Sequence, residues 1–549
     1  MIPTIRSTAL SVCSLGLLTV AFACSTSVEA PSTRGPDGDA GAEASLDAGQ
    51  AQATPVEWKP CPLHSEGKGP EVECAKIPVP LDPANPKGKT LPFFVKRYRP
   101  TGGKSQRALW MLQGGPGASG YVFENIAEQM ATRYPDVDYY IPDHRGTGQS
   151  SRLGCAPQEA DDSEGGQSIT EAEWGECLPA LKANFGEELR FYNTSAAAND
   201  LASAIKAIKA ETRPNDAGGP APVQPHFLLG VSYGTYWAHR FVQLFPSEAA
   251  GVVFDSVFPA GGSLARQDAD SDEAAHDFLD YCKTDAFCRE KMGPDPWGKA
   301  QDVFVKWREG SGCRAIDIPG FPTDMLLRRV FASFLMDPSL RTYIPAVIYR
   351  MSRCEARDVT ALQKLAAAVT QEAPSSEMMK QWSWGLSYNI IFSELWESPS
   401  PSVAELADIR NKAIASRDIT EMMGTLYAKW PKYEPDALSR SFATADTPML
   451  FLQGGLDPAT LRRKTLAMRA SFARPHQTWV DVPTATHTVF GSSSTTEGRS
   501  CGTKMFMSFI ENPTTPVDTS CLSQVVPPDF HNTKTSINAA LFGTNDAWE

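Results

Sequence analysis

The stretch "HFLLGVSYGTYWAHRFVQLF", residues 226–245, places Ser232 between two glycines. An apolar run precedes this serine and a segment of helical character follows it. A strand, a Gly-x-Ser-x-Gly turn and a helix form a nucleophile elbow, which presents a serine hydroxyl above a sheet. Gly230 and Gly234 fit this interpretation, because only small residues fit around so sharp a turn. The motif arises by chance roughly 0.2 times in a chain of this length, so the surrounding chain must decide.

The surrounding segments alternate between strand-like and helix-like patterns. A pair of antiparallel strands is predicted first, within 75–82 and 91–100. Continuous apolar runs then predict buried strands, and apolar spacing near 3.6 predicts an amphipathic helix. The strand predictions fall within 107–117, 136–150, 226–234 and 251–260, and the helix prediction covers 193–211. Such alternation indicates an α/β protein with a mostly parallel sheet.

The pattern breaks at about residue 261, where helix-like segments begin without a strong strand among them. The strand–loop–helix pattern returns near 441. We therefore expect a first core part over 57–260, a helical cap over 261–440, and a second core part with a C-terminal segment over 441–549. A helical insertion at this place is a natural lid over a site at the strand ends.

The N-terminus has the features of an export signal. Arg6 precedes a short apolar stretch, and residues 1–23 are predicted to be a signal peptide. Cleavage before Cys24 fits ordinary secretion, because "AFA" is a small-x-small pattern, and "AFAC" also resembles a bacterial lipobox in which Cys24 carries a lipid. Residues 24–56 contain no aromatic side chain, so we expect a disordered tether that holds the folded part at the cell envelope. Without lipidation the protein would be secreted freely.

Ten cysteines remain if Cys24 is lipidated. An even number in an exported protein favours disulfides. A zinc site is the weaker alternative, because the chain contains neither a CxxC nor a His-x3–5-His pattern. Pairing in chain order gives the shortest loops and predicts Cys61–Cys74, Cys155–Cys177, Cys282–Cys288, Cys313–Cys354 and Cys501–Cys521.

The charge and composition narrow the partners. The chain has 549 residues, a net charge of −13 and no basic stretch with interleaved aromatics, which argues against a nucleic-acid-binding protein. We expect no metal and no organic cofactor. We expect a monomer that meets the membrane only through a lipid anchor.

A serine nucleophile needs a general base. His487 in "PTATHTVFG" follows the last strand-like segment, where a loop can return over the sheet. His144 in "DHRGTG" and His239 in the helix after the elbow are less suitable. Asp457 ends an apolar strand in "FLQGGLDP", and the order Ser232, Asp457, His487 is the chain order of α/β-hydrolases. Asp457 would also suit a helix N-cap.

An oxyanion hole needs backbone N–H groups aimed at the developing charge. Tyr233, directly after the nucleophile, supplies one of them. The loop "QGGPG", residues 113–117, supplies the other. Gly115 is the first choice and Gly114 the second, since glycines let the backbone approach the substrate.

The motifs "QGGPG", "DHRGTGQS", "GVSYG", "GGLDP" and "ATH" occur in the order of a known family. The chain resembles the proline iminopeptidase and tripeptidyl aminopeptidase group of α/β-hydrolases over nearly all of 57–525. The resemblance implies an α/β-hydrolase fold whose large helical cap precedes the Asp-bearing strand and grips the amine of a free peptide N-terminus. Two positions depart from the family pattern: Gln113 replaces the usual histidine, and Phe392 replaces a cysteine common in the secreted branch.

The resemblance also implies an amine-binding residue in the cap. In "SYNIIFSELW", Glu394 follows a serine as in the family's cap motif, and Glu397 is its nearest rival. Trp382, Trp384 and Trp396 surround it in sequence and are candidates for the walls of an apolar pocket. The alternative is a glutamate on a solvated helix face.

Three functions compete. The first is an exported serine aminopeptidase, and the second is a carboxylic-ester hydrolase on the same fold, which fold alone does not separate from it. A non-enzymatic surface binding protein is disfavoured by a complete Ser–His–Asp set. A hydrolase with an aspartate nucleophile is disfavoured because residue 232 is serine.

Overall fold

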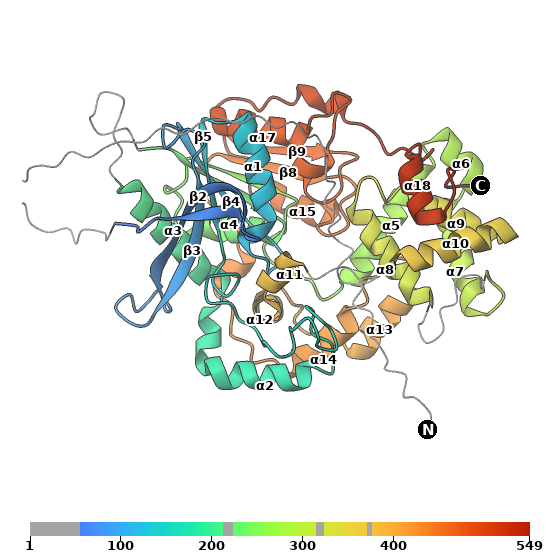
Figure 1. Cartoon of the computed structure of the whole chain (residues 1–549), viewed down its shortest axis with the longest axis horizontal. Helices are drawn as coiled ribbons and strands as arrows, with labels where there is room; N and C mark the ends of the chain where they lie inside the picture. The colour runs from blue at the N-terminus through green and yellow to red at the C-terminus, as the bar shows by residue number, and fades with distance from the viewer. Residues whose placement is uncertain (1–54, 212–222, 314–322, 370–375) are drawn as a thin grey trace, which may run out of the picture.

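The computed structural model describes residues 55–211, 223–313, 323–369 and 376–549. In these residues nine strands form one sheet in the order β1-β2-β3-β5-β4-β6-β7-β8-β9, with helices around it (Figure 1). The strands are β1 (Lys59–His64), β2 (Lys68–Pro80), β3 (Thr90–Tyr98), β4 (Arg107–Leu112), β5 (Val137–Pro142), β6 (His226–Val231), β7 (Gly251–Asp255), β8 (Met449–Gly454) and β9 (Gln477–Val482).

The sheet is antiparallel at its start and parallel beyond. β2 pairs antiparallel with β3, with Pro80 opposite Thr90, which confirms the predicted opening pair. β3 then pairs antiparallel with β5, and every later neighbour is parallel. All residues of β6, β7 and β8 are buried, as strands covered on both faces should be. The predicted mostly parallel α/β sheet is confirmed.

Two layers of helices cover the sheet. Helices α3 and α4 share a hydrophobic cluster with one face, and α1 and α17 share a cluster with the other. The helices outside the insertion are α1 (Glu124–Arg133), α2 (Trp174–Phe185), α3 (Thr194–Lys209), α4 (Tyr233–Leu244), α15 (Arg462–Arg469), α16 (Val489–Ser492), α17 (Cys501–Glu511) and α18 (Thr535–Phe542). Short 3-10 helices cover η2 (Gly120–Phe123), η3 (Gly186–Phe191), η4 (Ala437–Arg440) and η5 (Ser520–Gln524).

The described residues between β7 and β8 form helices and no strand of the sheet. The helices are α5 (Gln267–Cys282), α6 (Ala286–Met292), α7 (Pro296–Arg308), α8 (Thr323–Met336), α9 (Tyr343–Arg353), α10 (Ala356–Val369), α11 (Glu377–Gln381), α12 (Trp384–Glu394), α13 (Val403–Lys412) and α14 (Thr420–Lys429). This insertion packs as two units. The α5–α10 lobe has a hydrophobic cluster of its own, whereas apolar side chains of α12 and α14 join the cluster of the sheet, α3 and α4. We call residues 376–430 the α11–α14 segment.

The end of the chain packs on the α5–α10 lobe, where α18 lies beside α10 (Figure 1). Phe530, Phe542 and Trp548 belong to the hydrophobic cluster of the lobe. The Trp548 side chain is 1% exposed, and its indole N–H donates to the Phe530 carbonyl over 2.9 Å. The Glu549 carboxylate pairs with Arg353 at 2.7 Å. The C-terminal segment thus joins the sheet-bearing part of the molecule to the lobe.

The five predicted disulfides are present: Cys61–Cys74, Cys155–Cys177, Cys282–Cys288, Cys313–Cys354 and Cys501–Cys521. Cys61–Cys74 joins β1 to β2, and Cys282–Cys288 joins α5 to α6. Such a set fits a protein that folds outside the reducing cytoplasm.

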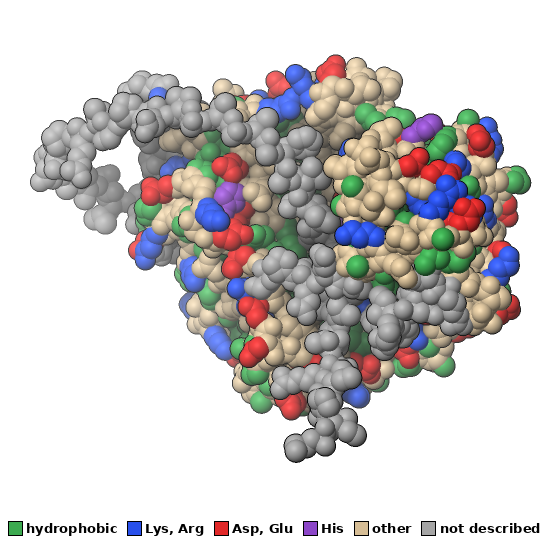
Figure 2. Space-filling model, turned by 45° about the vertical axis from the view of Figure 1, so that its right-hand side comes forward, with side chains coloured by type: hydrophobic (Ala, Val, Ile, Leu, Met, Phe, Trp, Pro, Cys, Tyr) green, Lys and Arg blue, Asp and Glu red, His purple; other side chains and the backbone are tan. Residues whose placement is uncertain are grey.

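Several predictions concern residues that the structure does not describe: the signal peptide, Cys24 and most of the tether lie within 1–54. None of the described helices has the length and apolar character needed to span a bilayer. On the face in Figure 2, basic and acidic side chains are intermixed and no extended basic patch is visible among the described residues.

Candidate active site

The serine of the GVSYG motif sits at the junction of β6 and α4. Ser232 has φ 58° and ψ −126°, a strained conformation for a residue with a side chain, which typically costs about 1–3 kcal/mol. A Cβ on Gly234 would overlap the Leu112 carbonyl, and a Cβ on Gly230 would overlap Gly234 itself. The Ser232 N–H donates to the Asp255 carbonyl over 3.0 Å. The strand, turn and helix are therefore those of a nucleophile elbow.

His487 and Asp457 are in direct contact. The Nδ1 atom of His487 lies 3.0 Å from each carboxylate oxygen of Asp457. Burial raises the pKa of Asp457, but the interaction with His487 and the hydrogen bonds from Thr460 lower it by more, so that the pKa lies below its ordinary value. An ionised carboxylate only accepts hydrogen bonds, so Nδ1 carries the proton. The Nε2 atom is then free to accept a proton from a nucleophile.

Asp457 also organises its own loop. Its Oδ1 accepts the N–H groups of Ala459 and Thr460, both at 2.9 Å, and its Oδ2 accepts the Thr460 hydroxyl at 2.7 Å. The carboxylate therefore holds a turn as well as the imidazole, but the helix N-cap that the sequence also allowed is wrong, because α15 begins at Arg462 and its N-cap residue is Leu461. These bonds keep its fully buried side chain in one orientation.

A residue that the sequence did not single out connects the two arms of the site. The buried Asp255 accepts the N–H of Val489 at 2.6 Å and of Phe490 at 2.8 Å through its two carboxylate oxygens. Its backbone carbonyl holds Ser232. Asp255 thus fastens the elbow and the loop after His487 to the end of β7. An aspartate that closes the apolar run "GVVFD" was the available signal.

The next residue continues this connection, because the Ser256 hydroxyl accepts the Thr488 N–H over 2.8 Å. The Ser232 hydroxyl makes no hydrogen bond with the described residues, and such catalytic bonds often form only with substrate.

The predicted oxyanion loop lies against the elbow. A Cβ on Gly114 would come within 2.8 Å of the Ser232 Cβ and 3.2 Å of the Tyr233 nitrogen. Gly115 is exposed while Gly114 and Pro116 are buried. Neither the Gly115 nor the Tyr233 N–H donates a hydrogen bond to any described residue. Both donors therefore have no internal acceptor among the described residues. The Tyr233 N–H lies at the N-terminus of α4, where partial positive charge gathers, and Gly115 follows the glycine that contacts the elbow.

Glu394 lies in a buried polar cluster beneath the elbow helix. Its side chain is 3% exposed. Oε1 accepts the Thr194 N–H at 2.9 Å and the Tyr433 hydroxyl at 2.7 Å. Oε2 accepts the Tyr236 hydroxyl at 3.1 Å and lies 3.8 Å from Arg240. Burial, and then the charge of Glu394, raise the pKa of both tyrosines well above its ordinary value.

The rival residue and the three tryptophans occupy different places. Glu397 pairs with Arg266 at 2.9 Å. Trp382 lies beside the oxyanion loop, since its Cη2 would be 3.1 Å from a Cβ on Gly115. Trp384 adjoins it, with ring centres 5.5 Å apart. Trp396 stacks on Tyr427 at 5.2 Å, within an aromatic cluster between α12 and α14. The structure therefore brings Trp382 to the site, with Trp384 behind it.

The other two histidines considered as a base are interior. His144 Nε2 lies 3.1 Å from the Tyr233 hydroxyl, and His239 Nε2 accepts the Ala443 N–H at 2.9 Å. Burial lowers the pKa of each to about 3. Both are neutral packing residues, and His144 steadies the side chain that follows the nucleophile.

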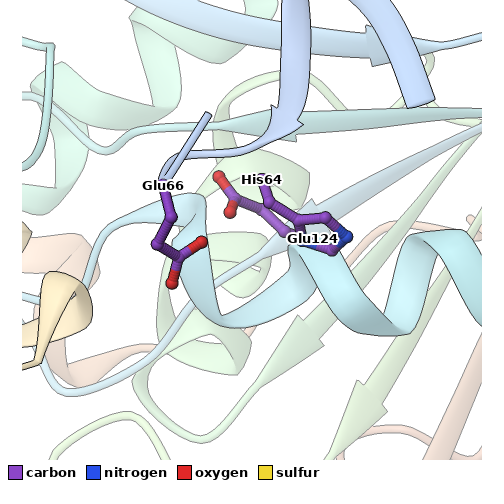
Figure 3. A group of neighbouring side chains, drawn as sticks. All are labelled: His64, Glu66 and Glu124. Atoms are coloured by element: carbon purple, nitrogen blue, oxygen red, sulfur yellow. The ribbon is translucent and has the colours of Figure 1, made fainter. Parts of the chain in front are cut away.

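One group of side chains of the metal-binding types occurs in the described residues: His64, Glu66 and Glu124, with ligand atoms within 4.8 Å of one another (Figure 3). The Lys96 ammonium donates to Glu124, and the Tyr121 hydroxyl donates to Glu66. The Ser65 N–H, in the turn between β1 and β2, donates to Glu124 over 2.8 Å, and His64 Nε2 lies 2.8 Å from Glu128, so the group ties the β1–β2 hairpin to α1.

Two family models match the chain. One, described as "alpha/beta hydrolase fold", matches residues 107–276, and one described as "TAP-like protein" matches 414–521. The first range holds the elbow, and the second holds Asp457 and His487.

Two curated relatives each match a part of the chain. A tripeptidyl aminopeptidase of Streptomyces lividans is 31% identical over 230 residues, and one of Streptomyces coelicolor is 30% identical over 230 residues. Each match covers 39% of this chain and 40% of the relative, so the chain matches two fifths of the length of these relatives.

The similarity to solved structures is low. A proline iminopeptidase-related protein from Thermus thermophilus is 14% identical over 75% of this chain and 90% of its own, with a TM-score of 0.29, which supports no further argument. The first family match and the strand–elbow–helix arrangement show an α/β-hydrolase fold, and the TAP-like match with the two relatives supports a place in the TAP-like group.

Proposed function

We propose that the protein is an exported serine aminopeptidase that cleaves peptides near their free N-termini through an acyl-enzyme. The observation that carries this proposal is the His487–Asp457 pair at 3.0 Å, fastened through Asp255 to the elbow that bears Ser232. The relatives named tripeptidyl aminopeptidase support a peptide substrate.

The proposed reaction begins when Ser232 Oγ attacks the scissile carbonyl carbon and its proton moves to His487 Nε2. The carbonyl oxygen becomes an oxyanion that accepts hydrogen bonds from the N–H groups of Gly115 and Tyr233, with Gly114 as the second candidate. The C–N bond breaks as His487 gives the proton to the leaving amine. Water then attacks the acyl-enzyme, His487 takes a proton from it, and that proton returns to Ser232 Oγ as the acid leaves.

Glu394 is the proposed partner of the substrate ammonium. A carboxylate offers about four acceptor positions, and three of them hold Thr194, Tyr236 and Tyr433. The remaining position is on Oε2, where Arg240 stays at 3.8 Å, beyond hydrogen-bond distance. An ammonium placed there would form a charge-assisted hydrogen bond, and Trp382 would wall the acyl side of the pocket.

The test of the proposed function is a substrate panel with Ser232→Ala and His487→Ala. Aminoacyl, tripeptidyl and N-blocked chromogenic peptides are compared with small esters. We expect cleavage of free-amine peptides by the wild type, labelling of Ser232 by a fluorophosphonate, and loss of both in Ser232→Ala. Near-normal turnover in both variants would refute the mechanism. Turnover of esters alone would favour the carboxylic-ester hydrolase, and absence of labelling would favour a binding protein.

We propose further that Cys24 carries a lipid that tethers the enzyme to the cell envelope. The support is the "AFAC" sequence followed by a long stretch without aromatic residues. Metabolic labelling with a palmitate analogue should tag the wild type and spare Cys24→Ala. Equal labelling of the two would remove this proposal.

A further inference from the structure

We propose that Ser387, on α12 of the insertion, is a positioning residue for the oxyanion hole: its hydroxyl holds the Pro116 carbonyl and thereby fixes the N–H of Gly115. This inference rests on the proposed function, because it concerns the hole that a serine hydrolase needs. It makes the insertion part of the catalytic framework.

The Ser387 hydroxyl has a clear direction. Its Oγ lies 2.6 Å from the Pro116 carbonyl and 2.8 Å from the Ser383 carbonyl. The Ser383 carbonyl already accepts the Ser387 N–H at 3.0 Å, whereas the buried Pro116 carbonyl has no other donor among the described residues. Since a hydroxyl has one hydrogen to donate, Pro116 is the acceptor that needs it. The Trp382 indole N–H donates to the same Oγ over 3.1 Å and orients it.

The oxyanion loop, residues 113–117, also packs tightly against the start of α12. A Cβ on Gly117 would collide with the Ser387 hydroxyl and come within 2.6 Å of the Ser383 carbonyl. The Gly117 carbonyl accepts the Ser383 N–H at 2.9 Å. The Ser383 hydroxyl in turn donates to the Leu153 carbonyl at 2.5 Å. The turn that begins α12 is therefore bonded to the oxyanion loop and to the loop after β5.

The oxyanion loop is thus held from two sides. Gly114 presses on the elbow, and Pro116 and Gly117 are bonded to α12, so Gly115 between them has its exposed N–H fixed by both. A hydrogen bond to an oxyanion strengthens in the transition state, so a misplaced donor lowers kcat more than it raises KM. Loss of a whole donor typically costs about 100- to 1,000-fold in kcat, and we expect a displaced donor to cost about one tenth of that.

The experiment compares Ser387→Ala with Ser416→Ala. Ser416 is a matched control, because its buried hydroxyl donates to Asp268 over 2.9 Å within the insertion and lies outside the described site. For each variant, kcat and KM are measured per fluorophosphonate-titrated site, on a free-amine peptide and on a small ester, together with Ki for a boronic acid whose tetrahedral adduct places an oxygen in the hole.

We expect Ser387→Ala to lower kcat about 10- to 100-fold on both substrates, with KM nearly constant and the boronate Ki raised by the same factor. Ser416→Ala should leave kcat and Ki unchanged. Wild-type kcat and Ki in Ser387→Ala, or a change in KM alone, would overturn the inference. If this variant does not fold, Ser387→Cys replaces the hydroxyl with a weak S–H donor and should show a smaller change of the same kind; an unchanged kcat there would count against the inference.

The two proposals fail in different ways. If the wild type cleaves the ester and not the peptide, the aminopeptidase proposal fails while the Ser387 comparison stands. If the wild type does not react with the fluorophosphonate at Ser232, the proposed function fails and the inference about the hole fails with it.

Discussion

The α5–α10 lobe and the α11–α14 segment belong to one insertion but contact different parts of the site: the lobe contacts the loop of His487, and the segment contacts the oxyanion loop. The lobe has its own hydrophobic cluster and reaches the base, since Arg341 donates to the Thr484 carbonyl over 2.5 Å and Thr486 donates to the Leu335 carbonyl over 2.6 Å. The α11–α14 segment shares the cluster of the sheet and reaches the oxyanion loop through Ser387.

The difference indicates separate roles. The α5–α10 lobe has its own core, into which the C-terminal segment packs, and its two hydrogen bonds support the loop that carries His487. The α11–α14 segment shares the core of the sheet and carries Glu394 and Trp382, the two residues for which we propose substrate contact. Under the proposed function, the insertion is a scaffold on one side and a recognition element, the α11–α14 segment, on the other.

The largest effect on activity is expected in the recognition element. Glu394→Gln removes the charge that would bind a substrate ammonium, and a hydrogen bond to a charged group is worth about 1.5–3 kcal/mol. We expect kcat/KM on a free-amine peptide to fall about 10- to 100-fold, with cleavage of an amine-free ester preserved. Steady-state kinetics on both substrates measure this split.

Glu397→Gln is the matched control and should change neither rate. An equal loss on peptide and ester for Glu394→Gln would mean that Glu394 only supports the fold, and it would strengthen the ester-hydrolase alternative.

An intermediate effect is expected at Asp255, which joins the elbow to the loop after His487. Burial raises the pKa of Asp255 from 3.8 to about 6, so the folded state favours its protonated form. Its contribution to the free energy of unfolding is then greatest below pH 3.8 and is lost as the pH rises to about 6. Asp255→Asn cannot titrate, so the advantage of the wild type over this variant should shrink by about 3 kcal/mol between these limits.

Urea unfolding of both proteins across that pH range provides the measurement. Parallel curves for the two proteins would show that Asp255 does not titrate there. The variant should also lose turnover at neutral pH, because an amide cannot accept the N–H groups of both Val489 and Phe490.

The smallest effect on activity is expected from a change deep in the lobe. Trp548→Ala removes a large buried side chain from the cluster of the α5–α10 lobe, and such truncations cost about 3–5 kcal/mol. We expect a lower unfolding midpoint in calorimetry with kcat per titrated site unchanged. A fall in kcat comparable to that of Glu394→Gln would remove the distinction between the two halves.

The local parts of this arrangement could be predicted from the sequence. The elbow, the order of Ser232, Asp457 and His487, and the five disulfides depend on motifs, chain order and short loops. The parallel strands followed from continuous apolar runs. The elbow and the strands were read from short local patterns, and the paired cysteines lie only 6 to 41 positions apart in the chain.

The remaining contacts join residues far apart in the chain. Ser387 and Pro116 are 271 positions apart, and Asp255 meets Val489 across 234 positions. Helical periodicity also cannot show which helices of an insertion share a core, so the division into lobe and segment, and the packing of Trp548 against the lobe, required the tertiary structure. The tryptophans illustrate the same limit, because Trp382 and Trp396 are neighbours in sequence and only Trp382 contacts the oxyanion loop.

The most direct test of the account uses the wild-type enzyme and one change in the substrate. A chromogenic tripeptide with a free N-terminus is compared with the same peptide acetylated at that amine. The kcat/KM of each is measured over a range of substrate concentrations. The account predicts that acetylation lowers kcat/KM about 100-fold, since it removes the cation that Glu394 would bind. Equal rates on the two peptides would contradict it, because the α11–α14 segment would then have no part in recognising a peptide N-terminus.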